Sequence, residues 1–216
     1  MIKRVIFDID NTLIEWKSEY DDEIEKSLKK FKIPYTNNDL KNIFDAMEKY
    51  ESTYYTYKRN QILDFINTYT KKNYPMKLLN DVLYRWSLCV PKKIDDNIIE
   101  TLEYLNKKYE MVILTDWFGK EQENRLKLLS ISKYFSKVFA AENVKRKPFK
   151  EAFLTAIEKN KPEECMMIGD NFERDVQGAL NAGLKAIYFD SNNKSSIENE
   201  NGYYIISNLV ELKNIL

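Results

Sequence analysis

The stretch that decides the fold is KRVIFDIDNT, residues 3–12, in which a short apolar run ends in two acidic side chains. Similar continuous apolar runs occur at 112–115, 166–170 and 186–190, with a weaker one at 138–140. A run that is apolar throughout, rather than alternating, is typical of a strand covered on both faces. These five runs are therefore predicted to be strands of a parallel sheet.

Apolar residues at helical spacing occupy the intervals between these strands. They fall at 98–105, 126–129 and 149–157. Strands and helices that alternate in this order indicate βαβ units and an α/β fold with a Rossmann-like, doubly wound parallel sheet. Such sheets bind ligands beyond the carboxyl ends of their strands. Residues 190–200 are predicted to be a polar loop.

The segment 16–90 behaves differently, because it carries no strand pattern and four successive amphipathic helical patterns. The patterns span 20–31, 40–47, 62–69 and 79–86. Pro91 ends this insert, and the alternating pattern then resumes. The sequence predicts two domains: a Rossmann-like core of residues 1–15 and 91–216, and an inserted four-helix cap of residues 16–90.

The composition excludes several chemistries, since the 216 residues include 34 basic and 34 acidic side chains, two cysteines and no histidine. Without imidazole, neither a serine-histidine-aspartate relay nor a histidine-ligated zinc is available within this chain. Zero net charge argues against a nucleic acid polymer as partner, and no apolar run reaches the ~20 residues of a membrane span. Because Cys89 and Cys165 suit buried thiols, we expect a cytoplasmic protein.

Polar residues follow several predicted strands or begin a predicted helix. They are Asp8, Asp10, Thr115, Lys147, Asp170 and Asp175. Each alone has an ordinary explanation as a solvated turn, a helix cap or one charge of a basic loop. Their order along the chain, always at the same edge of the sheet, favours a joint site.

These residues stand in DIDNT at 8–12, in the lone Thr115 and Lys147, and in GDNFERD at 169–175. The set resembles the four motifs of the haloacid dehalogenase-like (HAD) hydrolase superfamily, which are D-x-D-x-T/V, a Ser or Thr, a Lys, and G-D-x-x-x-x-D. The resemblance covers nearly the whole chain. The helical insert after the first motif resembles the type 1 cap of subfamily I.

Together, the chemistry of these side chains and the resemblance suggest a role for each residue. Asp8 would attack phosphorus and form an aspartyl-phosphate, and Asp10 would act as general acid and base. Asp8 and Asp170 offer hard oxygen ligands that suit Mg²⁺, and the resemblance adds the backbone carbonyl of Asp10. Thr115 and Lys147 would hold phosphoryl oxygens. Asp175 would support the ligands or Lys147.

Within the resemblance, the second acid favours phosphate chemistry, because members that act on carbon–halogen bonds or phosphonates lack an Asp at the position of Asp10. We expect a Mg²⁺-dependent phosphatase that acts on a small phosphorylated metabolite, as a monomer or weak homodimer. One alternative is a phosphomutase of the β-phosphoglucomutase type. Another is a non-catalytic phosphate-sensing module. The substrate stays open among nucleotides, sugar phosphates and flavin mononucleotide.

Two features leave the interpretation open. Asp116 and Trp117 follow Thr115, where the family commonly has Asn and a small residue. Asp116 either caps the next helix or adds negative charge near the phosphate, which would favour a substrate with an amine or hydroxyls. In the cap, the stretch YYTYKR at 54–59 either stacks on a substrate ring or lies on an amphipathic helix and covers its core.

Overall fold

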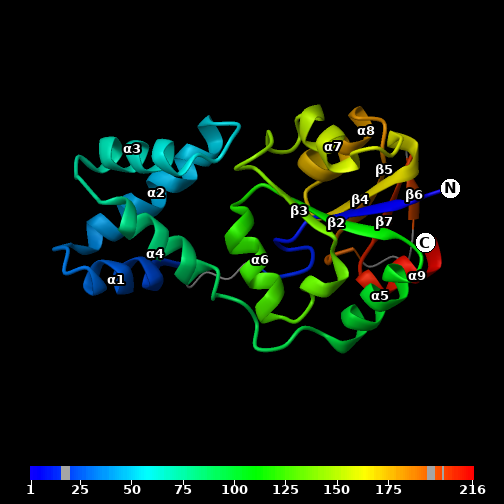
Figure 1. The fold of residues 1–216 in the computed structure, drawn as a ribbon, viewed down its shortest axis with the longest axis horizontal. Helices are drawn as coiled ribbons and strands as arrows, with labels where there is room; N and C mark the ends of the chain where they lie inside the picture. The colour runs from blue at the N-terminus through cyan, green and yellow to red at the C-terminus, as the bar shows by residue number, and fades with distance from the viewer. Residues whose placement is uncertain (16–19, 194–197, 201) are drawn as a thin grey trace.

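The computed structural model describes residues 1–15, 20–193, 198–200 and 202–216. Figure 1 shows two lobes, a sheet flanked by helices and a bundle of helices joined to it after the first strand. Trp16, where the sequence places the start of the helical insert, lies outside the described residues. No helix in the described part of the chain is both long and apolar enough to cross a membrane.

Within the described residues, seven strands form one sheet in the order β3-β2-β1-β4-β5-β7-β6. The strands are β1 Arg4–Phe7, β2 Glu110–Thr115, β3 Lys137–Ala140, β4 Cys165–Gly169, β5 Lys185–Phe189, β6 Glu198–Glu200 and β7 Tyr203–Ile206. All neighbouring pairs are parallel except β6 with β7. The predicted α/β class with a doubly wound parallel sheet is confirmed.

The strand β6 corrects the prediction of a polar loop over 190–200, because it occupies the last three residues of that range. Glu198–Glu200 forms β6, which pairs antiparallel with Tyr203–Ile206. Because β6 is a three-residue strand at the edge of the sheet, its pairing needs backbone hydrogen bonds and no apolar face. Its polar sequence, Glu-Asn-Glu, therefore carries no strand pattern.

Helices cover both faces of the sheet, as Figure 1 shows. They are α5 Asp96–Asn106, α6 Gly119–Leu128, α7 Lys150–Ile157, α8 Gly178–Asn181 and α9 Leu212–Ile215. Side chains alternate along β1, so Val5 and Phe7 pack with α5, α6 and α9, while Ile6 packs with α7 and α8. Burial on both faces explains why the strand sequence is continuously apolar.

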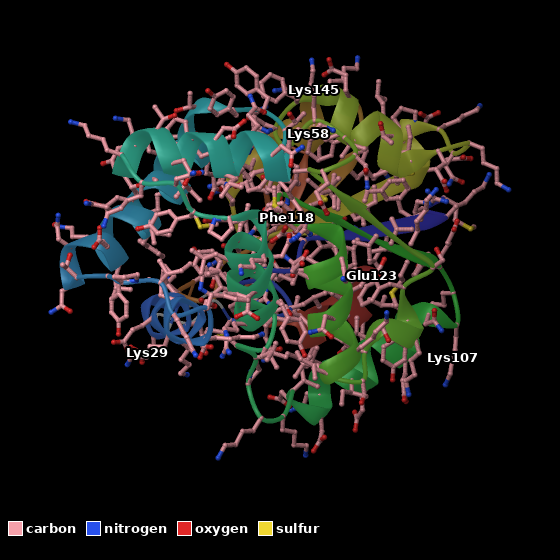
Figure 2. All side chains as sticks on the ribbon, turned by 60° about the vertical axis from the view of Figure 1, so that its left-hand side comes forward. Lys29, Lys58, Lys107, Phe118, Glu123 and Lys145 are labelled. Atoms are coloured by element: carbon pink, nitrogen blue, oxygen red, sulfur yellow. The ribbon has the colours of Figure 1, made fainter. Side chains whose placement is uncertain are left out.

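The second lobe consists of α1 Tyr20–Lys30, α2 Asn37–Thr53, α3 Arg59–Thr70 and α4 Met76–Trp86. All four helices lie between β1 and β2 in the chain, as the sequence predicts, and they share one apolar core. That core continues through Trp117 and Phe118 of the sheet lobe. Figure 2 shows Phe118 at the junction of the two lobes. The helical lobe is thus packed directly against the carboxyl ends of the central strands.

Strand register explains why the predicted site residues meet. Phe7 pairs with Ile113 of β2 on one side and with Ile168 of β4 on the other. The backbone N–H of Asp8 donates to the Ile168 carbonyl at 2.9 Å. The chain therefore leaves β1, β2 and β4 within two residues of the same level, beneath the helical lobe.

Candidate active site

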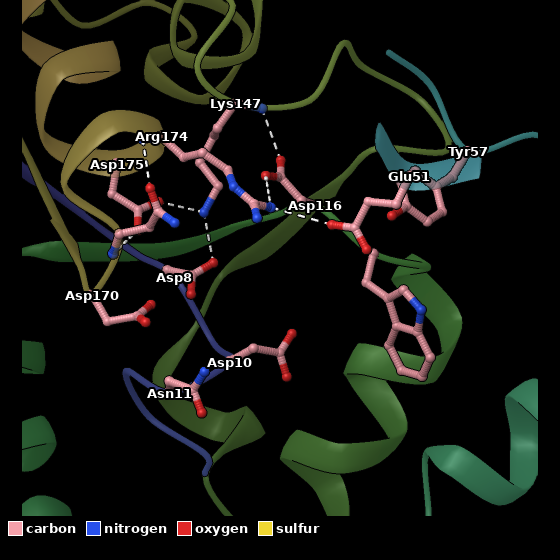
Figure 3. A pocket seen from close by; sticks show the side chains of 12 residues that line it. Asp8, Asp10, Asn11, Glu51, Tyr57, Asp116, Lys147, Asp170, Arg174 and Asp175 are labelled. Atoms are coloured by element: carbon pink, nitrogen blue, oxygen red, sulfur yellow. Dashed lines mark hydrogen bonds and ion pairs between the residues drawn. The ribbon is translucent and has the colours of Figure 1, made fainter. Parts of the chain in front are cut away.

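A cavity of about 250 Å³ lies at this edge of the sheet, between the strand ends and the helical lobe. Of the predicted site residues, those that line it are Asp8, Asp10, Asp116, Lys147, Asp170 and Asp175. The remaining lining residues are Asn11, Glu51, Tyr57, Trp117, Asn171 and Arg174. Figure 3 shows these side chains pointing into one space from several segments of the chain.

Lys147 lies between two carboxylates (Figure 3). Its Nζ is 2.6 Å from Asp8 Oδ1 and 2.5 Å from Asp175 Oδ1, and all three residues are buried. Burial alone lowers the pKa of Lys147, but the facing carboxylates of Asp175 and Asp8 outweigh it and raise that pKa above its ordinary value. The ammonium therefore stays charged where it meets Asp8.

Three carboxylates gather beside this lysine, with oxygens of Asp8, Asp170 and Asp175 all within 4.8 Å of one another. Burial raises the pKa of Asp8 well above its usual range, and Asp175 and Asp10 add to the effect while Lys147 opposes it. Burial, followed by the charge of Asp175, also raises the pKa of Asp170. A cation among these groups would relieve the cost of keeping them ionised.

The oxygens of the cluster are not equivalent. Asp175 Oδ1 accepts from Lys147, and its Oδ2 accepts from the backbone N–H of Asn171 at 3.0 Å. Both oxygens of Asp175 thus accept hydrogen bonds within the protein, whereas the side-chain hydrogen bonds to Asp8 and Asp170 engage one oxygen of each, Oδ1, from Lys147 and Thr12 respectively. Hard oxygen donors of this kind fit Mg²⁺. This arrangement agrees with a supporting role for Asp175.

The packing of Asp175 depends on the small size of Gly169. A Cβ atom at position 169 would lie 2.3 Å from the Asp175 carboxyl group. Such a distance is far inside van der Waals contact, so only glycine allows β4 to approach this carboxylate.

Asp10 is held by two side chains that the sequence analysis did not place in the site. Gln122 Nε2 donates to Asp10 Oδ2 at 2.7 Å and to Thr115 Oγ1 at 3.0 Å. Arg125 Nη1 donates to Asp10 Oδ1 and to Gln122 Oε1. Thr115 is buried and is not among the residues that line the cavity. It is connected to Asp10 through Gln122.

Asp116 does not cap the following helix, which corrects one of the two expectations for it. The N-cap of α6 is Phe118, without a side-chain cap bond, and Glu142 Oε2 accepts from the Gly119 N–H at 2.9 Å instead. Asp116 Oδ1 accepts from the backbone N–H of Lys147 at 2.8 Å, and its Oδ2 is 3.5 Å from Arg174 Nη1. Asp116 therefore faces the cavity and fixes the segment that carries Lys147.

The helical lobe contributes Glu51 from the last turn of α2. Its Oε1 accepts from Arg146 Nη2 at 2.9 Å and from Arg174 Nη1 at 3.2 Å, and both arginines belong to the sheet lobe. An acidic side chain near the carboxyl end of a helix is unfavourable for that helix. The position of Glu51 thus suits the contact between the lobes rather than the stability of α2.

The segment 54–58 connects α2 to α3 and is not helical, contrary to the amphipathic helix considered for it. Its Tyr57 N–H donates to the Ala141 carbonyl at 2.9 Å, and Lys58 Nζ donates to the Glu142 carbonyl at 2.9 Å. Tyr57 is buried and lines the cavity, whereas Tyr54 and Tyr55 line a second, neighbouring cavity of about 480 Å³. The segment therefore joins the two lobes over the site.

Comparisons with known proteins agree with the fold and the motifs. A family model described as haloacid dehalogenase-like hydrolase matches residues 5–189. The N-acylneuraminate-9-phosphatase of Mus musculus is 28% identical over 126 residues, 56% of this chain and 51% of that protein. The phosphorylated carbohydrates phosphatase of Thermotoga maritima is 24% identical over 87% of this chain and 84% of that protein.

The first of these relatives, and its rat and human counterparts, are matched over about half of their length. Among solved structures, YfnB from Bacillus subtilis bound to magnesium has a TM-score of 0.74 at 19% identity. That comparison covers 100% of this chain and 98% of the other. At this identity the likeness shows a shared fold, including the helical lobe.

Proposed function

The chain belongs to the haloacid dehalogenase-like hydrolase family, and from this membership we propose that it is a Mg²⁺-dependent phosphatase acting on a small phosphorylated metabolite. One observation carries the proposal: Asp8, held by Lys147 next to Asp170, shares a cavity with a second carboxylate, that of Asp10. Curated relatives named as phosphatases support the same reaction class.

In this proposal Asp8 supplies the nucleophile. One of its oxygens attacks phosphorus, an acyl-phosphate bond forms, and the bond between phosphorus and the leaving oxygen breaks. Lys147 fixes the other oxygen of Asp8 and places a positive charge beside the phosphoryl group. Mg²⁺, when bound by Asp8, Asp170 and the backbone carbonyl of Asp10, supplies further positive charge against the phosphate dianion.

Asp10 acts on the leaving group and then on water. It gives a proton to the leaving oxygen as the phosphoryl group moves to Asp8, and it takes a proton from the water that later attacks the aspartyl-phosphate. Such general acid and base catalysis is worth about 10² to 10⁴-fold in rate. The two steps release inorganic phosphate and restore both carboxyl groups.

The helical lobe and Asp116 define where the leaving group lies. We assign residues 16–90 to a cap domain and residues 1–15 and 91–216 to the core, with Glu51 and Tyr57 facing the core across the cavity. Carboxylates of Glu51 and Asp116 flank the Arg174 guanidinium. Paired acceptors and donors of this kind favour a leaving group that carries hydroxyl or amino groups.

The test is a phosphate-release screen with Mg²⁺ over phosphorylated sugars, nucleotides and flavin mononucleotide. We expect release from at least one compound, and loss of release with Asp8→Asn, which keeps the volume and removes the nucleophile. Full activity of Asp8→Asn, or no release from any compound, would contradict the proposal. A phosphoenzyme that resists water but transfers its phosphoryl group to an acceptor sugar phosphate would favour the mutase.

A further inference from the structure

We propose that Gln122 and Arg125 are positioning residues that hold Asp10 in the orientation required of the acid that protonates the leaving oxygen. The inference rests on the proposed phosphatase function and adds two residues to it. Neither side chain belongs to the motifs noted in the sequence, and neither lines the cavity.

Asp10 needs support from outside its own segment. It lies in a turn after β1, where Asn11 has a positive φ of 58° and its N–H donates to the Ile14 carbonyl at 2.8 Å. The Asp10 carboxylate accepts its side-chain hydrogen bonds from α6 and not from this turn. The orientation of the Asp10 carboxylate must therefore come from another part of the protein.

One helix provides that support through two neighbouring positions. Gln122 and Arg125 lie three residues apart on α6 and thus on the same helical face. Each donates to a different oxygen of Asp10, as described above. Both donors are fully buried, whereas the Asp10 side chain keeps 25% exposure toward the cavity. Gln122 and Arg125 thus hold the Asp10 carboxylate on the side of α6, while the exposed part of the Asp10 side chain faces the cavity.

Gln122 and Arg125 also fix each other's orientation. Gln122 Oε1 accepts from Arg125 at 2.9 Å, which leaves its Nε2 hydrogens for Asp10 and for Thr115 at the end of β2. The amide can therefore have only one orientation in this network. A partly buried ion pair such as Arg125 with Asp10 contributes little net stability. Its main consequence here is a defined orientation of the acid.

The test compares two classes of substrate by kcat/KM, which reports the steps through formation of the phosphoenzyme. An alkyl phosphate needs protonation of its leaving oxygen, whereas p-nitrophenyl phosphate releases a phenolate that leaves without it. With Gln122→Met, which keeps volume and removes the hydrogen bonds, we expect alkyl phosphate hydrolysis to fall about 10²-fold. Hydrolysis of p-nitrophenyl phosphate should fall less than about 5-fold. Arg125→Met should give the same pattern, and Arg125→Lys should restore part of the loss.

Two controls separate positioning from general damage to the fold. Leu126→Ala alters the same buried face of α6 without contacting Asp10, so it should affect both substrates equally. Gln122→Met combined with Asp10→Asn should cost little beyond Asp10→Asn alone, because the glutamine acts through Asp10.

Equal losses on both substrates for Gln122→Met and Arg125→Met would overturn the inference, and so would losses that add fully to that of Asp10→Asn. Those results would not contradict the proposed phosphatase function. A wild-type protein that releases no phosphate from p-nitrophenyl phosphate or from any compound of the metabolite screen would instead overturn the proposed function, and the inference with it.

Discussion

At the scale of residues, the acidic side chains of the candidate site are arranged around one lysine, Lys147. Lys147 contacts Asp8 and Asp175 through its ammonium, while its backbone N–H is held by Asp116. Three carboxylates thus fix one lysine, two at its ammonium and one at its backbone. Because every contact is buried or nearly so, the ammonium stays in place when a phosphate arrives, which favours preorganised stabilisation of the transition state.

The two functions of Asp116 can be separated by a pair of substitutions. Asp116→Asn keeps the oxygen that accepts from the Lys147 N–H and removes the charge near Arg174, so kcat on p-nitrophenyl phosphate should change less than about 3-fold. Asp116→Ala removes the acceptor as well and should lower that kcat about 10-fold or more. Steady-state kinetics of both variants check the prediction, which fails if the two variants behave alike.

Residue identity could be predicted from the sequence only where a motif marks it. Asp8, Asp10, Lys147, Asp170 and Asp175 all lie in recognisable positions, and the structure brings them together. Gln122 and Arg125 carried a weaker signal, since both are buried and each lies four residues before a buried leucine, Leu126 and Leu129 respectively. Glu51 gave no such signal, because its partners Arg146 and Arg174 are about a hundred residues away in the chain.

At the scale of elements, α1 and α4 of the cap are joined by a buried charge. Asp81 on α4 accepts from Ser27 Oγ at 2.9 Å, from Lys30 Nζ at 2.5 Å and from Arg85 Nε at 2.8 Å. Burial raises the pKa of Asp81, but its bonds with Lys30, Arg85 and Ser27 outweigh burial, and the pKa is lowered overall. The folded cap therefore favours the ionised carboxylate.

Asp81→Asn should destabilise the cap by about 1–3 kcal/mol at neutral pH, because the bonds to charged partners are weakened. The stabilisation by Asp81 is fully present above its unfolded pKa of about 3.9 and is lost as pH falls through the lower pKa of the folded state. The difference between wild type and variant should thus shrink below about pH 4.

Hydrogen exchange of α1 and α4 amides at neutral and acidic pH provides the measurement for Asp81→Asn. Asp64→Asn is the matched control, since this exposed acid lies on α3 and should change stability by less than about 0.5 kcal/mol. Equal protection of wild type and Asp81→Asn at neutral pH would contradict the prediction.

Elements with a continuous apolar or helical pattern were predictable, and polar edge elements were not. The central strand β1 and the helices α1 to α4 have side chains that must be buried, so their patterns are strong. β6 needs only backbone pairing with β7, and the connection at 54–58 is set by contacts with the other lobe. Tertiary contacts of this kind leave no local periodicity.

At the scale of the whole molecule, the two lobes meet through charges around the cavity. Glu51 pairs with Arg146 and Arg174, and Arg59 of α3 pairs with Glu121 and Glu142. These contacts surround the apolar junction of Trp117 and Phe118. Polar contacts between lobes can be broken and remade at low cost, which would suit the role of a substrate-admitting cap that we propose for the helical lobe.

Glu51→Gln should weaken closure of the cap by removing the charge shared by the two arginines. We expect KM for the metabolite substrate to rise several-fold, and exchange of the amides at 54–58 to become faster. Glu48→Gln, one helical turn earlier and exposed, is the matched control and should leave both quantities unchanged. Unaltered KM and unaltered exchange in Glu51→Gln would show that the pair does not hold the cap.

The organisation of the whole chain could be inferred from the sequence because the insert interrupts a regular alternation of strands and helices. The way the lobes face each other could not, since it depends on side chains such as Glu51 and Arg59 that look like ordinary surface charges. Their role becomes visible only when residues distant in sequence lie within 3.2 Å of each other.

The most direct test of the account is the detection of phosphate on Asp8 itself. Wild type and Asp10→Asn are mixed with Mg²⁺ and p-nitrophenyl phosphate, quenched in acid and treated with borohydride, which reduces an aspartyl-phosphate to homoserine. Peptide mass mapping should find homoserine at position 8 alone, in larger amount for Asp10→Asn because water attack is slowed. Turnover by the wild-type protein without any modification at position 8 would contradict the central claim.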